Sequence, residues 1–206
     1  MKIEYFGHSF VKITFRDFSV AIDPYGDIGL TPPKVSADYV FCSHNHYDHN
    51  NAGFISGAKR IDAGNIKDSG GRFEIIKTFH DEAFGALRGE NDALIINADG
   101  KKIVHFGDAG CFDEALVEKA RGADIIFIPV GGKYTIDAAG AKRYVEAINP
   151  KTVIPIHYKI DGSTVDIAKI DEFLKLIKVF KTEKSGFLYN VNEKGVIVVT
   201  PEVKHV

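Results

Sequence analysis

The segment Ser43-His44-Asn45-His46-Tyr47-Asp48-His49 places four metal-capable side chains close together in the chain. It follows Tyr39-Val40-Phe41-Cys42, a short apolar run typical of a buried β-strand. On extended backbone, His44 and His46 are two positions apart and point the same way, so they can hold one ion together. Asp48 and His49 follow the turn and would face a second position.

Three more apolar runs lead into a metal-capable side chain. They are Phe73 to Phe79 before His80, Ile103 to Phe106 before Gly107-Asp108, and Thr152 to Ile156 before His157. If these strands share one region of sheet, their ends form a rim on which nitrogen and oxygen ligands meet. Asp108 has two carboxylate oxygens that could bridge two ions. The predicted ligands are His44, His46, Asp48, His49, His80, Asp108 and His157.

This ligand set holds imidazoles and carboxylates and no thiolate. Such donors suit Zn, Mn, Fe, Co or Ni and disfavour Ca and Mg, which prefer mainly oxygen. Two such ions generate hydroxide at neutral pH by lowering the pKa of bound water. The alternative, scattered internal histidines, does not explain why the histidines gather at strand ends. We therefore expect a metal-dependent hydrolase with two divalent transition-metal ions, Zn being favoured.

The composition bounds the class of protein. A chain of 206 residues with 45% hydrophobic residues fits one domain, residues 1–206. A net charge of -2 gives no electrostatic reason to expect nucleic acid or an anionic membrane as partner, so a small-molecule substrate is expected. The chain has no apolar run of about 18 residues, and its start resembles a strand instead of a signal peptide. We expect a soluble, cytoplasmic protein; its oligomeric state is left open.

Strand signals indicate three hairpins. They join Ile3 to Phe15 with Phe18 to Ile22, Asp92 to Ala98 with Ile103 to Phe106, and Phe187 to Val191 with Val196 to Thr200. The second hairpin has Asp99-Gly100 at its turn, a dipeptide suited to positive φ angles.

Three amphipathic segments predict helices. Asp113 can cap a helix that stops at Gly122, Asp137 can cap one reaching Ile148, and a third runs from Asp166 to Ile177. Hairpins at both ends with strand and helix alternation between them predict the α/β class. The simplest architecture is two packed sheets covered by helices, a four-layer αβ/βα sandwich.

The pattern His44-x-His46-x-Asp48-His49, followed by His80, Asp108 and His157, resembles the metallo-β-lactamase superfamily. The resemblance implies that His44, His46 and His80 bind one metal and that Asp48, His49 and His157 bind the other, with Asp108 as the bridge.

A closer resemblance is to the branch of L-ascorbate-6-phosphate lactonase-like enzymes and uncharacterised metal-dependent hydrolases, and it covers nearly the whole chain. The supporting motifs are Gly7-His8-Ser9, Asp23-Pro24, Gly85 with Arg88-Gly89, Gly107-Asp108, Pro129-x-Gly131-Gly132 with Tyr134-Thr135, and Pro155-x-His157-Tyr158.

Departures from related subfamilies bear on the substrate. One main class of β-lactamases uses a cysteine on the second metal, whereas Asp108 opens the corresponding loop here and Cys111 lies three residues on. The helical domain of glyoxalase II and the inserted arm of the tRNA-processing nucleases are also absent. Antibiotic hydrolysis therefore loses support.

Other residues have weaker claims on the site. Asp48 or Asp108 is expected to relay protons, and Arg88, Tyr134 and Thr135 are candidates for substrate binding. His8, read as a mid-strand residue, is either a pocket residue or a satisfied strand histidine. Asp23 is either an orienting group or a turn residue, His105 and Cys42 are expected in the core, and Cys111 is not expected to be a ligand.

We expect hydrolysis of a small ester, lactone or phosphodiester by a metal-bound hydroxide. A nucleic-acid phosphodiesterase is one alternative, but it would need a basic surface that the sequence does not show. A non-catalytic metal- or oxygen-binding protein is the other alternative.

Overall fold

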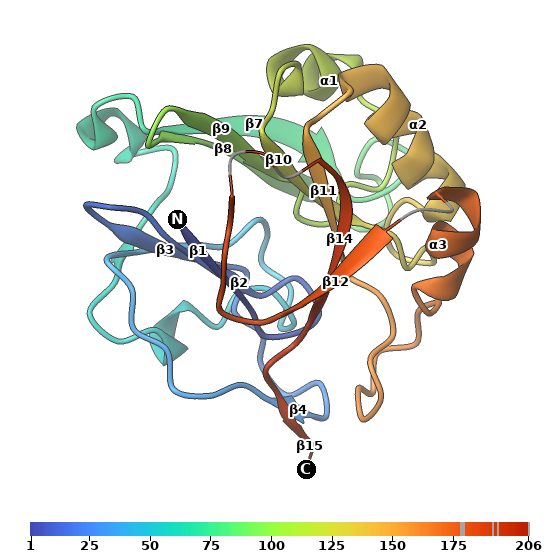
Figure 1. Ribbon diagram of the computed structural model, residues 1–206, viewed down its shortest axis with the longest axis horizontal. Helices are drawn as coiled ribbons and strands as arrows, with labels where there is room; N and C mark the ends of the chain where they lie inside the picture. Colours follow the sequence, from blue (N-terminus) through green and yellow to red (C-terminus); the bar gives the residue numbers. More distant parts are fainter. Residues whose placement is uncertain (178–179, 191, 193, 206) are drawn as a thin grey trace.

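The computed structural model describes residues 1–177, 180–190, 192 and 194–205, and its chain forms two β-sheets packed face to face (Figure 1). The first sheet has six strands in the order β13-β1-β2-β3-β5-β6. Their bounds are β1 Lys2–Tyr5, β2 Val11–Thr14, β3 Ser19–Ile22, β5 Tyr39–Phe41, β6 Lys59–Arg60 and β13 Phe187–Leu188. A two-stranded sheet, β4 Leu30–Thr31 with β15 Lys204–His205, lies apart from them.

The second sheet has seven strands in the order β12-β14-β11-β10-β9-β8-β7. Their bounds are β7 Phe73–Phe79, β8 Glu90–Ala98, β9 Lys101–His105, β10 Ile125–Pro129, β11 Thr152–Ile156, β12 Phe180–Lys184 and β14 Gly195–Thr200. The run from β9 through β10 and β11 to β14 and β12 is parallel, while β7, β8 and β9 are antiparallel neighbours. Parallel strands buried on both faces read as continuous apolar runs, as in Ile125–Pro129.

Alternation along the six-stranded sheet divides its side chains between two faces. Ile3, Ile13 and Val20 lie opposite one another across three strands and belong to the main core between the sheets. Ala21 and Val40, one position out of phase, belong to a second core on the other face.

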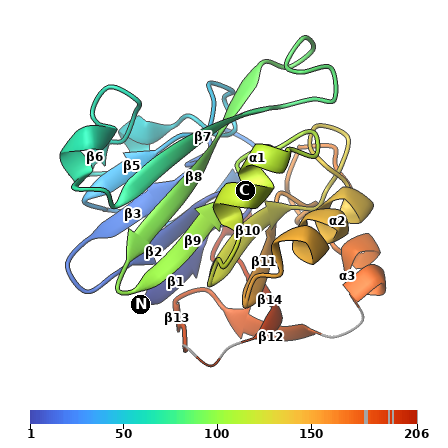
Figure 2. The same ribbon diagram turned by 90° about the horizontal axis from the view of Figure 1, so that it is seen from above.

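The α-helices cover the outer face of the seven-stranded sheet (Figures 1 and 2). They are α1 Glu114–Ala120, α2 Ala138–Ile148 and α3 Asp171–Ile177. The outer face of the six-stranded sheet is covered by irregular chain, which contributes Ile28 and Val165 to the second core. Two short 3-10 turns complete the elements, η1 Ala52–Phe54 and η2 Ile66–Ser69. The predicted fold class is confirmed, with loops forming the layer over the first sheet.

Both helix caps predicted at Asp113 and Asp137 are present. The Asp113 side chain accepts a hydrogen bond from the Leu116 N–H, and the Asp137 side chain accepts one from the Gly140 N–H. The third helix begins at Asp171 instead of Asp166, because the chain at Ala168 bonds to two loops instead: its N–H donates to the Gly131 carbonyl and its carbonyl accepts from the Lys159 N–H.

The expected strand from Ile3 to Phe15 is wrong. The chain turns back between β1 and β2, with Gly7 at φ 91° and His8 at φ 52°, and the Phe10 N–H closes the turn on the Gly7 carbonyl. His8 therefore lies in a turn and not in mid-strand. The apolar residues around the turn are buried on both sides, so hydrophobicity alone did not mark the reversal.

The predicted third hairpin is also wrong. Phe187–Leu188 pairs with β1 in the first sheet, whereas Gly195–Thr200 pairs with β11 and β12 in the second. The predicted strand end at Val191 lies outside the described residues. The other two hairpin pairings are present, the second with Asp99 and Gly100 at positive φ. Among the helices of the described chain, none is long and apolar enough to span a membrane.

Candidate metal centre

All seven predicted ligands gather where the ends of the two sheets meet. His44 to His49 follow β5 of the first sheet, while His80, Asp108 and His157 follow β7, β9 and β11 of the second. The sequence had suggested a rim on a single region of sheet, but the site draws on both. Their ligand atoms form overlapping groups in which all atoms lie within 4.8 Å of one another.

The first group consists of His44, His46 and His80. The ring centroid of His44 lies 4.6 Å from the ring centroid of His46 and 4.6 Å from that of His80. The His80 Nδ1 lies 2.9 Å from the Tyr134 carbonyl oxygen, a contact in which Nδ1 carries the proton. This fixes the ring and leaves the His80 Nε2 lone pair free for a metal ion.

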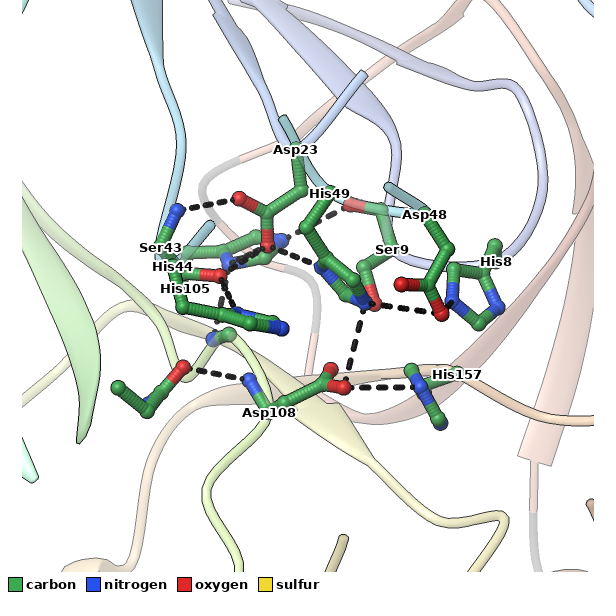
Figure 3. Close-up of polar contacts among 12 residues, drawn as sticks. His8, Ser9, Asp23, Ser43, His44, Asp48, His49, His105, Asp108 and His157 are labelled. Carbon is green, nitrogen blue, oxygen red and sulfur yellow. Dashed lines mark hydrogen bonds and ion pairs between the residues drawn. The ribbon is translucent and has the colours of Figure 1, made fainter. Parts of the chain in front are cut away.

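Asp108 contacts histidines of both parts of the site, and Figure 3 shows its carboxylate between His49 and His157. Its Oδ2 is 3.3 Å from the His80 Nε2, 3.2 Å from the His49 Nε2 and 3.1 Å from the His157 Nε2. The backbone N–H of Asp108 donates to the Asn91 side chain at 2.8 Å, and the Asn91 amide donates to the Phe106 carbonyl. Asn91 thus fixes the start of the Asp108 loop, a role that no sequence motif indicated.

The second group consists of Asp48, His49, His157 and, in addition, His8. The His8 Nε2 lies 3.2 Å from the Asp48 Oδ2, and its ring centroid lies 4.2 Å from that of His157. The turn between β1 and β2 brings His8 to this place, and the misread turn is why the sequence left its role open.

Asp23 contacts His49 and Ser43 on the side of the His49 ring away from Asp108 (Figure 3). Its Oδ2 lies 3.1 Å from the His49 Nδ1, and its two oxygens accept hydrogen bonds from the Ser43 N–H at 2.7 Å and the Ser43 hydroxyl at 2.9 Å. The His49 Nε2 is thereby left facing Asp108. Of the two readings of Asp23 in the sequence, the orienting role agrees with these contacts.

The pKa values reflect burial and close charges. Burial lowers the pKa of His44 to about 3, and burial with the neighbouring His157 lowers the pKa of His8 to about 4. Burial acts against the charged forms of His49 and Asp108 as well, but it is outweighed at His49 by Asp108 and Asp23, and at Asp108 by His157 and His49. The pKa of His49 is raised well above its usual value, and that of Asp108 is held well below. The position between Asp23 and Asp108 therefore favours a positive charge.

The donors present fit a transition-metal site. Within the described part of the chain, the buried His44 Nε2, Asp108 Oδ1 and His157 Nδ1 have no hydrogen-bond partner, and the Nε2 atoms of His49 and His157 contact the Asp108 carboxylate without hydrogen-bond geometry. Leaving such atoms unpaired costs about 1–3 kcal/mol each. Imidazole nitrogens and carboxylate oxygens that converge in this way are the donors that Zn and its neighbours bind.

Three other residues, His105, Cys111 and Cys42, do not join the ligand groups found among the described residues. The ring nitrogens of His105 are both engaged, with Nε2 at 3.1 Å from the Ser9 carbonyl oxygen and Nδ1 accepting from the Gly107 N–H. Its core assignment agrees with these contacts. Cys111 is a free cysteine on the wall of a neighbouring cavity, and Cys42 is buried.

Two cavities open beside the ligands. One, of about 440 Å³, is lined by His46, Asp48, Asp108 and residues of the 164–166 loop. The other, of about 640 Å³, extends towards α2 and contains Thr135 and Arg143. His80, Arg88 and Tyr134 line both. The Thr135 hydroxyl donates to the Ile136 carbonyl, so this side chain is partly committed.

The loop that carries Arg88 is held by a buried carboxylate. Asp81 accepts hydrogen bonds from the backbone N–H groups of Ala83, Gly85, Leu87 and Arg88 at 2.7–3.2 Å. The Arg88 guanidinium lies over the Tyr134 ring, 5.5 Å from its centroid. None of the ion pairs found among the described residues includes Arg88, and Arg88 lines both cavities.

Comparison with known proteins agrees with this geometry. The family described as "Beta-lactamase superfamily domain" matches residues 2–157. The chain belongs to this superfamily. A UPF0173 metal-dependent hydrolase of Staphylothermus marinus is 31% identical over 212 residues, covering 85% of this chain and 90% of that protein. Another from Bacillus velezensis is 27% identical over 201 residues, covering 77% and 85%. The chain is thus a member of the UPF0173 metal-dependent hydrolases, and the predicted superfamily is confirmed.

Solved structures support the same fold. A Thermotoga maritima protein proposed as a Zn-dependent hydrolase of the metallo-beta-lactamase superfamily has a TM-score of 0.76 and 28% identity, and the match covers 96% of this chain and 97% of that one. Igni18, a metallo hydrolase of Ignicoccus hospitalis, has a TM-score of 0.66 at 22% identity, with 100% and 97% covered. The second likeness shows the fold alone.

Proposed function

We propose that this chain is a dinuclear metal-dependent hydrolase of a small ester, lactone or phosphodiester. The observation that supports it best is the place of Asp108, whose Oδ2 lies 3.1–3.3 Å from histidine nitrogens of both ligand groups. In this proposal His44, His46 and His80 hold one ion, while Asp48, His49 and His157 hold the other. Asp108 spans the two. The proposed ions are Zn, with Mn, Fe, Co or Ni as alternatives.

When bound, two such ions would lower the pKa of a water molecule at neutral pH and polarise the group under attack. The residues of the chain do the rest. Asp48 lies at the mouth of the smaller cavity and is ionised, because His8 and His49 outweigh burial and lower its pKa. It can accept a proton from the attacking water or pass one to the leaving group, and Asp108 is the second candidate for that transfer.

Arg88 and Tyr134 line both cavities, so they are placed to bind the part of the substrate that does not react. A guanidinium beside an aromatic ring suits an anionic or planar polar group. Thr135 would contribute to the wall of the larger cavity. Binding energy from such remote contacts would orient the scissile bond at the ligand cluster.

The rival is a nuclease on the same scaffold. A net charge of -2 gives no general attraction for phosphate backbones, so we propose a small-molecule substrate. We also propose that the enzyme is cytoplasmic and consists of a single domain. A second rival binds metal without turnover. It predicts metal content but no rate on any substrate.

A hydrolysis screen on protein of defined metal content tests the proposal. Phosphodiesters, lactones, esters and single-stranded RNA are compared at zero, one and two ions per chain. We expect turnover on a small substrate that rises with the second ion and disappears on chelation. Preferred cleavage of RNA, or rates unaffected by metal removal, would contradict it. With the substrate in hand, Arg88→Gln should raise KM about tenfold or more with little change in kcat, whereas Arg16→Gln at the β2–β3 turn should change neither.

A further inference from the structure

We propose that His8 is a fifth protein ligand of the second metal ion, binding through Nε2 beside Asp48, His49, His157 and the shared Asp108. The inference rests on the proposed dinuclear site and adds a residue outside the His44 to His157 set. Its ligand atom is within 4.8 Å of those of Asp48, His49 and His157, so the group is drawn from three separate segments of the chain.

The backbone holds His8 in a costly conformation at this point. A φ of 52° places it in the left-handed region, which costs a residue with a side chain of order 1–3 kcal/mol. Two hydrogen bonds impose it: the His8 carbonyl accepts from the His157 N–H at 2.7 Å and from the Tyr5 hydroxyl at 2.8 Å. The bond to His157 ties His8 directly to another residue of the same ligand group. Strain that surrounding contacts maintain is typical of functional positions.

The donor spacing matches a shared ion. Ligand atoms about 2.0–2.2 Å from one ion, at angles between octahedral and tetrahedral, lie about 2.9–3.5 Å apart. The His8 Nε2 is 3.2 Å from the Asp48 Oδ2. The same spacing recurs at 3.1 Å between the His157 Nε2 and the Asp108 Oδ2, two atoms assigned to the same ion.

The packing around His8 leaves few other roles. His8 is 2% exposed, His49 0% and His157 1%. The centroid of the His8 ring lies 4.9 Å from that of His49 and 4.2 Å from that of His157. Three imidazoles packed together away from water need polar partners, since burying such groups unpaired is unfavourable. The alternative role is positional, with the His8 N–H donating only to Asp48.

Substitution by glutamine separates the two roles. The Gln amide nitrogen reaches about as far as the histidine Nε2 and can donate to Asp48, but it is a poor ligand for transition metals. If His8 only positions Asp48, His8→Gln should preserve metal affinity. If His8 is a ligand, His8→Gln should weaken one of the two ions at least tenfold and leave the other within about threefold.

The measurements are Zn²⁺ affinity by chelator competition and the visible absorption of Co²⁺-loaded protein, for wild type, His8→Gln, Asp48→Ala and the double variant. We expect His8→Gln to change the Co²⁺ spectrum and to lower affinity in the Asp48→Ala background as well, because a ligand does not act through Asp48. Ser9→Ala, in the same turn and with a buried hydroxyl lacking a hydrogen-bond partner among the described residues, is the matched control and should match wild type.

The outcomes divide cleanly. Wild type that binds fewer than two ions at saturation overturns the dinuclear function and this inference with it. If wild type binds two ions but His8→Gln changes neither the Zn²⁺ affinity nor the Co²⁺ spectrum, the dinuclear function stands and the inference about His8 is overturned. The inference is also overturned if His8→Gln lowers Zn²⁺ affinity in wild type but not in the Asp48→Ala background. If His8→Gln does not fold, His8→Asn is used for the same measurements. Asparagine tolerates the left-handed backbone and, like glutamine, lacks the imidazole nitrogen proposed as the ligand.

Discussion

Replacing Asp23 by asparagine should weaken metal binding although Asp23 is not a proposed ligand. The carboxylate is completely buried and receives the Ser43 N–H at 2.7 Å, the Ser43 hydroxyl at 2.9 Å and the His49 ring at 3.1 Å. An Asn carbonyl can keep the Ser43 N–H, and the Ser43 hydroxyl can rotate to accept from the new amide. The His49 Nδ1 then loses its charged acceptor.

The expected size follows from these contacts. Hydrogen bonds to charged groups contribute about 1.5–3 kcal/mol each, so one lost and one weakened should lower the free energy of unfolding by about 2–4 kcal/mol. Loss of a carboxylate behind a ligating histidine typically reduces metal affinity 10–100-fold. We expect both effects in Asp23→Asn, measured by denaturant unfolding of metal-free protein and by chelator competition for Zn²⁺.

Asp38 offers a matched control. It too accepts from a serine N–H and hydroxyl, those of Ser19 at 2.8 Å and 2.7 Å, but it is exposed and has no histidine partner among the described residues. Asp38→Asn should cost less than about 1 kcal/mol and leave Zn²⁺ affinity unchanged. The orienting role of Asp23 would be refuted by unchanged affinity in Asp23→Asn, or by an equal loss in both variants.

Three further outcomes are expected. Asp108→Ala should cut turnover per bound ion at least a hundredfold while the fold survives; near-parental turnover with both ions retained would remove its proposed role. Gly110→Ala should lower metal affinity, because its Cβ would lie 2.3 Å from the His80 carbonyl carbon, whereas Gly53→Ala, with nothing within 4 Å, should leave affinity unchanged. Asp124→Asn should destabilise by about 1 kcal/mol at pH 7. Burial opposes ionisation there, but Lys151 and the Lys102 N–H hold the pKa of Asp124 below 3.8, so this stabilisation is present above that value and is lost as pH falls through the folded pKa. Equal losses at pH 7 and about pH 3, measured by urea unfolding, would contradict it.

The sequence predicted which residues gather at the candidate site better than it predicted the framework that brings them together. Local patterns, such as His44-x-His46 after an apolar run, indicate both a strand end and a ligand pair, because spacing and chemistry lie in one short segment. Asp113 and Asp137 were predicted as helix caps for the same reason. The membership of each strand in one sheet or the other is a property of long-range pairing, and no local pattern carries it.

The failures have the same physical origin. Phe187 and Val196 are close in sequence but pair with strands far away in the chain, so a hairpin was predicted where the chain crosses between sheets. His8 was placed in a strand because apolar neighbours on both sides of a buried turn look like one strand. Asn91, which fixes the Asp108 loop, sits in β8 and has no motif that distinguishes it from any strand asparagine.

The origin of the ligands in both sheets has a consequence for the order in which the protein matures. His44 to His49 belong to the half of the chain that pairs first in sequence, but their partners extend to His157, and the two groups meet only when the sheets have packed. The full set of proposed ligands therefore exists only in the assembled molecule, so we expect metal insertion to be a late event. Because the proposed site is complete only in the folded chain, the free energy of metal binding should resist separation of the sheets. Hydrogen exchange in β3 and in β11 should then slow together when metal is added.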